Sequence, residues 1–323
     1  MTTPSPRKTT KPRTKRVSPS RTPEVATSPG AVVEPPAAPL GSGTWVVLPT
    51  YNEADNIRTI SAAILDSLPA ATLLVVDDGS PDGTGTIADE LGATDPRIRV
   101  RHRAAKQGLG RAYLDGFGVA LRGGATIVVQ MDADWSHDPA TLPALIRPIV
   151  EDDADLVIGS RYTAGGGVVD WGLGRRLISR GGSIFAKNVL RLGPSDLTGG
   201  FKAWRASTLA AIPFDGVHAG GYVFQIEMTF RASRGGARVR EVPIVFRDRR
   251  VGQSKMSRRI VVEALVVVVT LRIDELRGRL TGRLPRGVRR IRDDSADTPN
   301  GQILDAPSGG PAAVEGPSAG KGG

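Results

Sequence analysis

Short apolar runs alternate with helix-like patterns along the middle of the chain, and this alternation restricts the fold more than any other feature. The spacing predicts strands at residues 45–49, 73–76, 97–100, 127–131 and 155–159, and helices at 53–67, through Ile87 and Leu91, at 108–121 and at 139–151. Apolar runs without polar alternation are typical of strands that are buried on both faces, and intervening helices connect parallel strands. We therefore expect an α/β fold in which helices flank both faces of a mostly parallel sheet.

Composition divides the chain into one folded domain and two tails. Residues 1–43 and 276–323 are rich in Pro, Ser, Gly and charge, and we expect both tails to be disordered because they offer little apolar area to bury. The tails hold +5 and +3 of the formal net charge of +10, which leaves +2 for the expected domain at residues 44–275. This near balance weighs against a nucleic-acid partner, although the basic N-terminal tail suits an anionic surface.

Several classes of protein are disfavoured by what the sequence lacks. The chain has no cysteine, which excludes a disulfide scaffold, a thiolate zinc site and a cysteine nucleophile. No apolar run reaches about 18 residues, so no membrane-spanning helix is expected, and residues 1–43 lack the apolar core of a secretory signal. No glycine-rich dinucleotide loop or Walker loop follows the first strand, which disfavours a dehydrogenase or a kinase. The three histidines (His102, His137 and His218) are expected on the surface or in loops rather than as a metal triad.

Polar clusters follow three of the expected strands. They occupy residues 49–53, 77–83 and 132–134. Because ligands bind beyond the carboxyl ends of the strands in such sheets, we expect the three clusters to meet at one edge and to form a site. Asp77 and Asp78 are adjacent, so one of them is expected to reach a ligand while the other fixes the loop.

Asp132 and Asp134 are the strongest candidates for a metal site. Two carboxylates that are two residues apart on an extended segment point the same way, and hard oxygen ligands suit Mg²⁺ or Mn²⁺. The alternative is a solvated turn without a ligand. The apolar strand before the pair and the two other polar strand ends favour the metal site.

Seven sequence motifs, taken together in their order along the chain, resemble those of the family 2 inverting glycosyltransferases. More narrowly, they resemble the polyprenol-phosphate (dolichol-phosphate) mannose synthases. The first three motifs are common to many family 2 enzymes, whereas the ordered set that includes the last four is more specific. The match spans residues 45–270. The motifs lie at residues 49–53, 76–84, 131–139, 159–167, 195–201, 221–228 and 249–255.

The resemblance implies a nucleotide-sugar-binding, GT-A-like fold and particular roles for single residues. The donor would be GDP-mannose, the acceptor a polyprenyl phosphate and the cofactor Mg²⁺ or Mn²⁺. Asp132 and Asp134 would hold the metal on the diphosphate, with Ala133 packed against the donor. Some relatives have a glutamine ligand where this chain has Ser136. The implied contacts with the nucleoside are Pro49, Tyr51, Glu53, Val76 and Asp78. The implied contacts with donor phosphate are Arg161, Arg249 and Lys255. Acceptor phosphate would be bound by Arg161 and Arg175.

Two alternatives to mannosyl transfer are also considered. A family 2 transferase that uses UDP-glucose or another UDP donor keeps the same fold and the same metal site. A basic-tailed binding module without catalysis leaves the seven ordered motifs unexplained. A phosphate acceptor is already an anion at pH 7, so no general base is assigned, and Glu227 is expected to be structural.

Two segments are candidates for contact with membrane lipid. Residues 173–192 carry apolar residues at helical spacing with basic residues between them, which is typical of an interfacial helix but also of a surface helix packed on a core. Residues 260–273 are too short to span a bilayer and are expected to form a buried helix that packs on the sheet. The resemblance therefore implies a cytoplasmic protein, peripheral on the cytoplasmic face of a membrane, and leaves a membrane-protein partner open.

Overall fold

The computed structural model describes Met1 and residues 38–218, 220–247 and 258–291. Most of both expected tails therefore lies outside the described residues, as do Arg249 and Lys255. The backbone of Arg175 is described, but its side chain is not. All the elements below belong to one compact unit, Pro39–Gly323.

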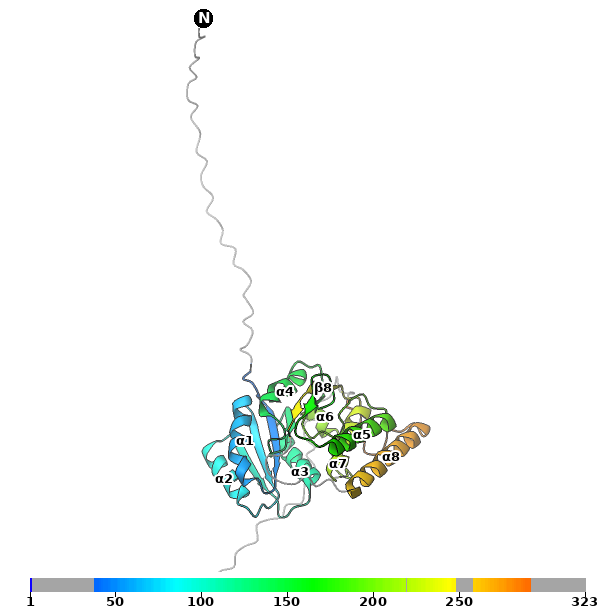
Figure 1. Ribbon diagram of the computed structural model, residues 1–323, viewed down its shortest axis with the longest axis horizontal. Helices are drawn as coiled ribbons and strands as arrows, with labels where there is room; N and C mark the ends of the chain where they lie inside the picture. Colours follow the sequence, from blue (N-terminus) through cyan, green and yellow to red (C-terminus); the bar gives the residue numbers. More distant parts are fainter. Residues whose placement is uncertain (2–37, 219, 248–257, 292–323) are drawn as a thin grey trace, which may run out of the picture. The chain divides into compact units, whose positions relative to one another are not determined.

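A seven-stranded sheet forms the centre of this unit (Figure 1). Its one reversed strand, β7, runs antiparallel to both of its neighbours, and the other pairs are parallel. A separate two-stranded sheet pairs β6 (Gly167–Val168) with β9 (Val245–Phe246). The spatial order of the large sheet is β3 (Ile98–His102), β2 (Thr72–Asp77), β1 (Thr44–Thr50), β4 (Ile127–Gln130), β7 (Lys202–Arg205), β5 (Leu156–Ser160) and β8 (Val239–Pro243).

Helices cover both faces of the sheet, as the alternation predicts. Alternate residues of β1 divide between two cores: Val46 and Leu48 pack with α1 and α4, and Trp45 and Val47 pack with α3 and α7. This alternation follows from the period of two along a strand. The helices are α1 (Ala54–Ser67), α2 (Thr84–Thr94), α3 (Leu109–Arg122), the 3₁₀ turn η1 (Pro139–Thr141), α4 (Leu142–Val150), α5 (Leu173–Leu190), α6 (Ala206–Ala210), α7 (Gly221–Arg234) and α8 (Arg258–Leu280).

A glycine brings α3 unusually close to the sheet. A Cβ atom added at Gly116 would lie 2.4 Å from Val47 Cγ1, so any larger residue would push the helix away from β1. This close packing determines how near the N-terminal half of α3 comes to the ends of β1 and β4. The Asp132 contact of Tyr113, described below, depends on it.

The expectation for residues 260–273 was wrong in two respects. The segment belongs to the longer helix α8, which continues past residue 275 and packs on α5 and α7 rather than on the sheet (Figure 1). Its outer side is also not buried: Val262, Val266, Val269 and Leu280 are among its exposed apolar residues. The apolar run reflects a helix with two apolar sides, and sequence periodicity alone does not separate that arrangement from full burial.

Helix α5 forms where the spacing predicts it, and its apolar residues divide between the core (Ala186, Leu190) and the exposed side. Leu173 and Leu177 are 78% and 74% exposed, whereas Ser179 and Ser183 face inward and are buried. Among the described residues, no helix combines the length and the apolar character that crossing a bilayer demands.

Candidate active site

The first two polar clusters meet at the carboxyl ends of β1 and β2. Pro49 pairs with Val76 and Thr50 with Asp77 in the parallel ladder, so both strands end side by side. The following loops are joined by hydrogen bonds: Asn52 N donates to Ser80 Oγ (3.1 Å) and Glu53 N donates to Thr84 Oγ1 (2.9 Å). The predicted meeting of these strand ends is therefore confirmed.

Asp77 and Asp78 divide their roles as adjacent strand residues must. Asp77 Oδ1 accepts hydrogen bonds from Thr50 Oγ1 (3.1 Å) and Ser80 Oγ (2.5 Å), so this carboxylate fixes the loop. Asp78 is 5% exposed and forms an ion pair with Arg103, which follows β3. Asp77 is therefore the residue that fixes the loop, and contact of Asp78 with a nucleoside stays a prediction.

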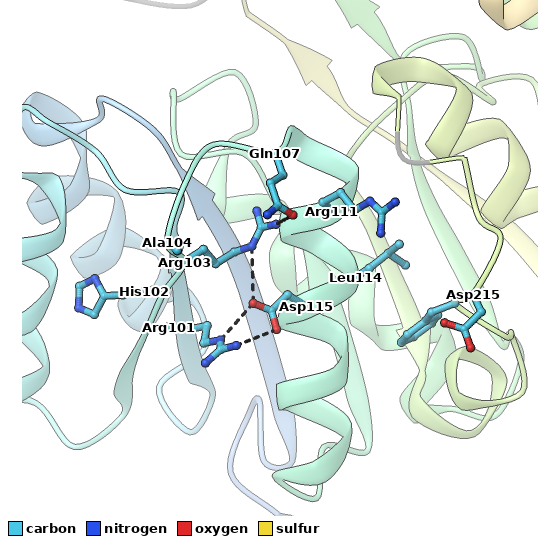
Figure 2. Close-up of a pocket in the computed structure, with 10 residues that line it drawn as sticks. Arg101, His102, Arg103, Ala104, Gln107, Arg111, Leu114, Asp115 and Asp215 are labelled. Carbon is cyan, nitrogen blue, oxygen red and sulfur yellow. Dashed lines mark hydrogen bonds and ion pairs between the residues drawn. The ribbon is translucent and has the colours of Figure 1, made fainter. Parts of the chain in front are cut away.

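A cavity of about 480 Å³ opens next to Arg103 (Figure 2). Arg101 and Arg103 both point toward Asp115 on α3, at 3.0 Å and 3.6 Å between Nε and Oδ2. Arg103 Nη2 also donates to Gln107 Oε1 (3.1 Å). Arg103 was missed by the sequence analysis, and its position directly after the expected strand at 97–100 was the signal that could have found it.

The other predicted nucleoside residues differ in accessibility. The Lys106 ammonium lies 3.3 Å from the ring centroid of Tyr51, so this ring already takes part in a cation–π contact. Glu53 Oε2 accepts a hydrogen bond from Asn56 (2.8 Å). Val76 is fully buried in the core, so a nucleoside could contact only its backbone. The nucleoside roles of Pro49, Tyr51, Glu53, Val76 and Asp78 stay predictions.

The third cluster follows β4, next to β1 in the sheet. Asp132 Oδ1 accepts a 2.8 Å hydrogen bond from the hydroxyl of Tyr113, which is fully buried on α3. Burial raises the pKa of Tyr113 well above its ordinary value, and the nearby Asp132 adds to this shift. The hydroxyl therefore keeps its proton and acts as a fixed donor to the carboxylate.

The Asp132–Asp134 segment fits a hard divalent cation. Asp134 is 5% exposed and its Oδ1 accepts from Ser136 N (3.1 Å), whereas no described residue donates a hydrogen bond to Asp132 Oδ2. Ser136 Oγ is buried and has no hydrogen-bond partner in the described part of the chain. The described residues contain no cluster of three or more His, Cys, Asp or Glu side chains. Two carboxylates are a usual protein contribution to a Mg²⁺ site that substrate phosphates and water complete.

His137 lies in a loop, which was one of the two places expected for it, but it is 2% exposed and not on the surface. Its Nδ1 accepts a hydrogen bond from Asp132 N (3.3 Å), and its ring stacks on Phe201 with centroids 4.8 Å apart. Burial lowers the pKa of His137, so the imidazole is neutral at pH 7. The sequence analysis missed this role because the contact depends on the turn at residues 132–137.

Arg161 follows β5 and is held by Asp196. Two 2.7 Å hydrogen bonds join Nε and Nη2 of Arg161 to the two carboxylate oxygens, and both side chains are buried. Burial opposes ionisation of Asp196, but the charge and hydrogen bonds of Arg161 outweigh it and lower the pKa of Asp196. Arg161 thus fixes the loop that leads to Gly200, and its contact with phosphate stays a prediction, as do those of Arg175, Arg249 and Lys255.

Glu227 lies on α7 and forms an ion pair with Arg231, one turn further along the helix. It is 1% exposed, and its carboxylate accepts hydrogen bonds from Arg231 Nη2 (2.6 Å) and from the backbone of His218 (2.9 Å). These contacts agree with the structural role expected for it.

Residues 45–212 match the family described as Glycosyl transferase family 2. The chain belongs to this family. The resemblance and the enzyme class predicted from the motifs are confirmed.

Two curated relatives match over almost their whole length. An undecaprenyl-phosphate mannosyltransferase of Micrococcus luteus is 46% identical over 72% of this chain and 97% of the relative. A polyprenol monophosphomannose synthase of Mycolicibacterium smegmatis is 43% identical over 77% of this chain and 96% of the relative.

A solved structure supports the fold. Glucosyl-3-phosphoglycerate synthase of Mycobacterium tuberculosis superposes with a TM-score of 0.52 at 18% identity, over 71% of this chain and 80% of that one. The predicted fold class, a GT-A-like sheet flanked by helices, is confirmed.

Proposed function

We propose that this protein transfers mannose from GDP-mannose to a polyprenyl monophosphate, with inversion, and so makes a β-mannosyl-phosphoryl lipid. The proposal is carried by sequence identity to two enzymes. One, at 46% identity, is named an undecaprenyl-phosphate mannosyltransferase, and the other, at 43%, a polyprenol monophosphomannose synthase. The convergence of Tyr51, Asp78 and the Asp132–Asp134 pair at one sheet edge supports it. The donor base is the part of the proposal that rests on the resemblance alone.

The donor would lie across the ends of β2, β1 and β4. Tyr51, Glu53 and Asp78 would bind the nucleoside, and Asp132 and Asp134 would hold Mg²⁺ or Mn²⁺. When bound, such a cation stabilises the negative charge that develops on the departing diphosphate. Tyr113 holds one oxygen of Asp132 in place, so less of the carboxylate's freedom is lost when the site fills.

The acceptor needs no base, because a phosphate monoester already carries a negative charge at pH 7. The difficulty is instead the approach of two anions, which calls for cations near the sugar. Arg161, Arg175, Arg249 and Lys255 are the proposed set. Direct displacement by the phosphate oxygen inverts the configuration at the sugar carbon.

Contact with the membrane is assigned to the outer side of α5. Leu173, Leu177, Ile178 and Ile184 are exposed on this helix while the basic residues Arg176 and Arg180 lie between them. An apolar side with flanking cations suits the boundary between lipid tails and anionic headgroups. We propose that the protein works as a peripheral protein on the cytoplasmic face.

A transfer assay tests the proposal. Purified protein is incubated with Mg²⁺, polyprenyl phosphate and one labelled donor (GDP-mannose, UDP-glucose or UDP-N-acetylglucosamine), and label in the lipid fraction is measured. We expect transfer from GDP-mannose only. Transfer from a UDP donor instead would replace the donor in this proposal.

A matched pair of variants tests the carboxylate site. Asp134→Asn should abolish transfer while the protein stays folded. Asp138→Asn is the control, because Asp138 is exposed and an asparagine also caps the following turn. Full activity of Asp134→Asn would remove the metal site from the mechanism.

A further inference from the structure

Two motifs that the proposed reaction leaves without a role, at residues 195–201 and 221–228, meet beside Asp132. The two motifs come together at Gly200, which precedes β7 and is partly exposed to solvent. A methyl group placed at Gly200 would lie 3.5 Å from Gln225 Nε2, 3.6 Å from Asp132 Oδ2 and 3.8 Å from His137 Cε1. These are ordinary van der Waals distances. The absent side chain of Gly200 therefore leaves a small space bordered by an amide, a carboxylate and a neutral imidazole.

The orientation of the Gln225 amide follows from its hydrogen-bond chain. Trp204 Nε1 donates to Gln130 Oε1 (2.9 Å), and an indole nitrogen can only donate. Gln130 must therefore present Nε2 on its other side, where it donates to Gln225 Oε1 (2.8 Å) and to Gly200 O (2.9 Å). It follows that the free end of Gln225 is Nε2, a donor, and that this end faces the space at Gly200.

This donor has no acceptor in the described part of the chain. Gln225 is 2% exposed, and no described residue accepts a hydrogen bond from its Nε2. The nitrogen itself is not fully enclosed, so a ligand that supplies the acceptor can reach it. The fixed direction of Nε2, set by Trp204 and Gln130, makes it a prepared contact for such a ligand.

We propose that Gln225 Nε2 and Asp132 Oδ2 bind one hydroxyl group of the hexose in the nucleotide-sugar donor, in the space that Gly200 leaves open. A hydroxyl both donates and accepts, so it satisfies the amide and the carboxylate together. A phosphate oxygen can only accept, so it could pair with the amide but could not donate a hydrogen bond to the carboxylate. The proposal rests on the proposed function, since it places the sugar of that reaction.

The test compares binding of the donor with binding of the nucleotide that lacks the sugar. Calorimetric affinities for GDP-mannose and for GDP are measured with Mg²⁺ for the wild-type protein and for two variants. Gln225→Met keeps the volume but removes the donor, and we expect GDP-mannose binding to weaken about three- to tenfold. Gly200→Ala fits the protein at the distances above but occupies the hydroxyl position, and we expect a loss of about tenfold or more. GDP should bind to both variants within twofold of wild type.

Gly193→Ala is the matched control, because Gly193 is exposed and no heavy atom lies within 4 Å of its added methyl group. It should bind both ligands as the wild type does. Equal loss of GDP and GDP-mannose binding in Gln225→Met would place the amide on the diphosphate and overturn the hexose contact. Unchanged GDP-mannose binding in both variants would overturn it as well.

The outcome is separable from that of the proposed function. If the wild type binds UDP-glucose and not GDP-mannose, the GDP-mannose donor is wrong, and the same comparison is made with UDP-glucose and UDP. If the wild type binds no nucleotide sugar, both proposals fail.

Discussion

The buried Arg161–Asp196 pair predicts a large and specific loss of stability when its negative charge is removed. Asp196 has no exposed side-chain surface and accepts from Arg161 Nε and Nη2 at 2.7 Å each. Asp196→Asn keeps the size of the side chain but removes the negative charge that faces the guanidinium at 2.7 Å. Breaking a buried pair in this way costs ~3–5 kcal/mol, because the remaining charge stays desolvated. For a domain of this size, that loss corresponds to a melting temperature lower by roughly 6–20 °C.

Urea unfolding followed by tryptophan fluorescence measures this effect against a matched exposed pair. Asp153 and Arg240 are 2.9 Å apart but have 54% and 57% exposed side chains, so Asp153→Asn should change the free energy of unfolding far less. The double variant Arg161→Met/Asp196→Leu should recover much of the loss, since it removes both buried charges. Equal losses in Asp196→Asn and Asp153→Asn would refute the role of burial in this reasoning.

Three further predictions concern the carboxylate site, a buried lysine and the membrane. Tyr113→Phe removes the hydrogen bond to Asp132 and should weaken Mn²⁺ binding in the presence of GDP about tenfold, measured by electron paramagnetic resonance; unchanged affinity would exclude the positioning role. Burial lowers the pKa of Lys202 to about 7, so the unfolded chain holds more protons than the folded one between pH 7 and 10. Wild-type stability should therefore rise with pH across that range relative to Lys202→Met, by up to ~1.4 kcal/mol per pH unit, and parallel curves would contradict this. Leu177→Gln removes an exposed apolar side chain from α5 and should weaken binding to anionic vesicles in a sedimentation assay about tenfold, with GDP affinity unchanged; wild-type vesicle binding would exclude α5 as the contact.

Local patterns were enough to predict five strands of the sheet and the meeting of polar strand ends at its edge, but not β7 or β8. The apolar runs at 45–49, 73–76 and 127–131 correspond to β1, β2 and β4, and the polar residues after them meet because parallel strands end at the same edge. Asp132 and Asp134 could be chosen because their chemistry depends on spacing along one segment. These inferences needed no knowledge of distant contacts.

The residues that sequence reasoning missed act through contacts between distant segments. Tyr113 reaches Asp132 because Gly116 lets α3 approach β1. Gln225 lies beside Gly200 because Lys202, the first residue of β7, donates a hydrogen bond to the Gln225 backbone on α7. Neither residue has a local signal that separates it from an ordinary core residue. The outer apolar side of α8 was missed for a related reason, since a helix that packs on α5 and α7 has the same apolar content as one buried under a sheet.

The central claim is that three strand ends form one nucleotide site. It is tested most directly by measuring GDP binding to variants that each change one residue at one strand end. Calorimetry with Mg²⁺ compares the wild type with Tyr51→Ala, Asp78→Asn and Asp134→Asn, which change residues after β1, β2 and β4. Each variant should stay folded and bind GDP at least about tenfold more weakly, because each loses a contact with the same ligand. Wild-type affinity in any one of the three would show that its strand end does not belong to the site.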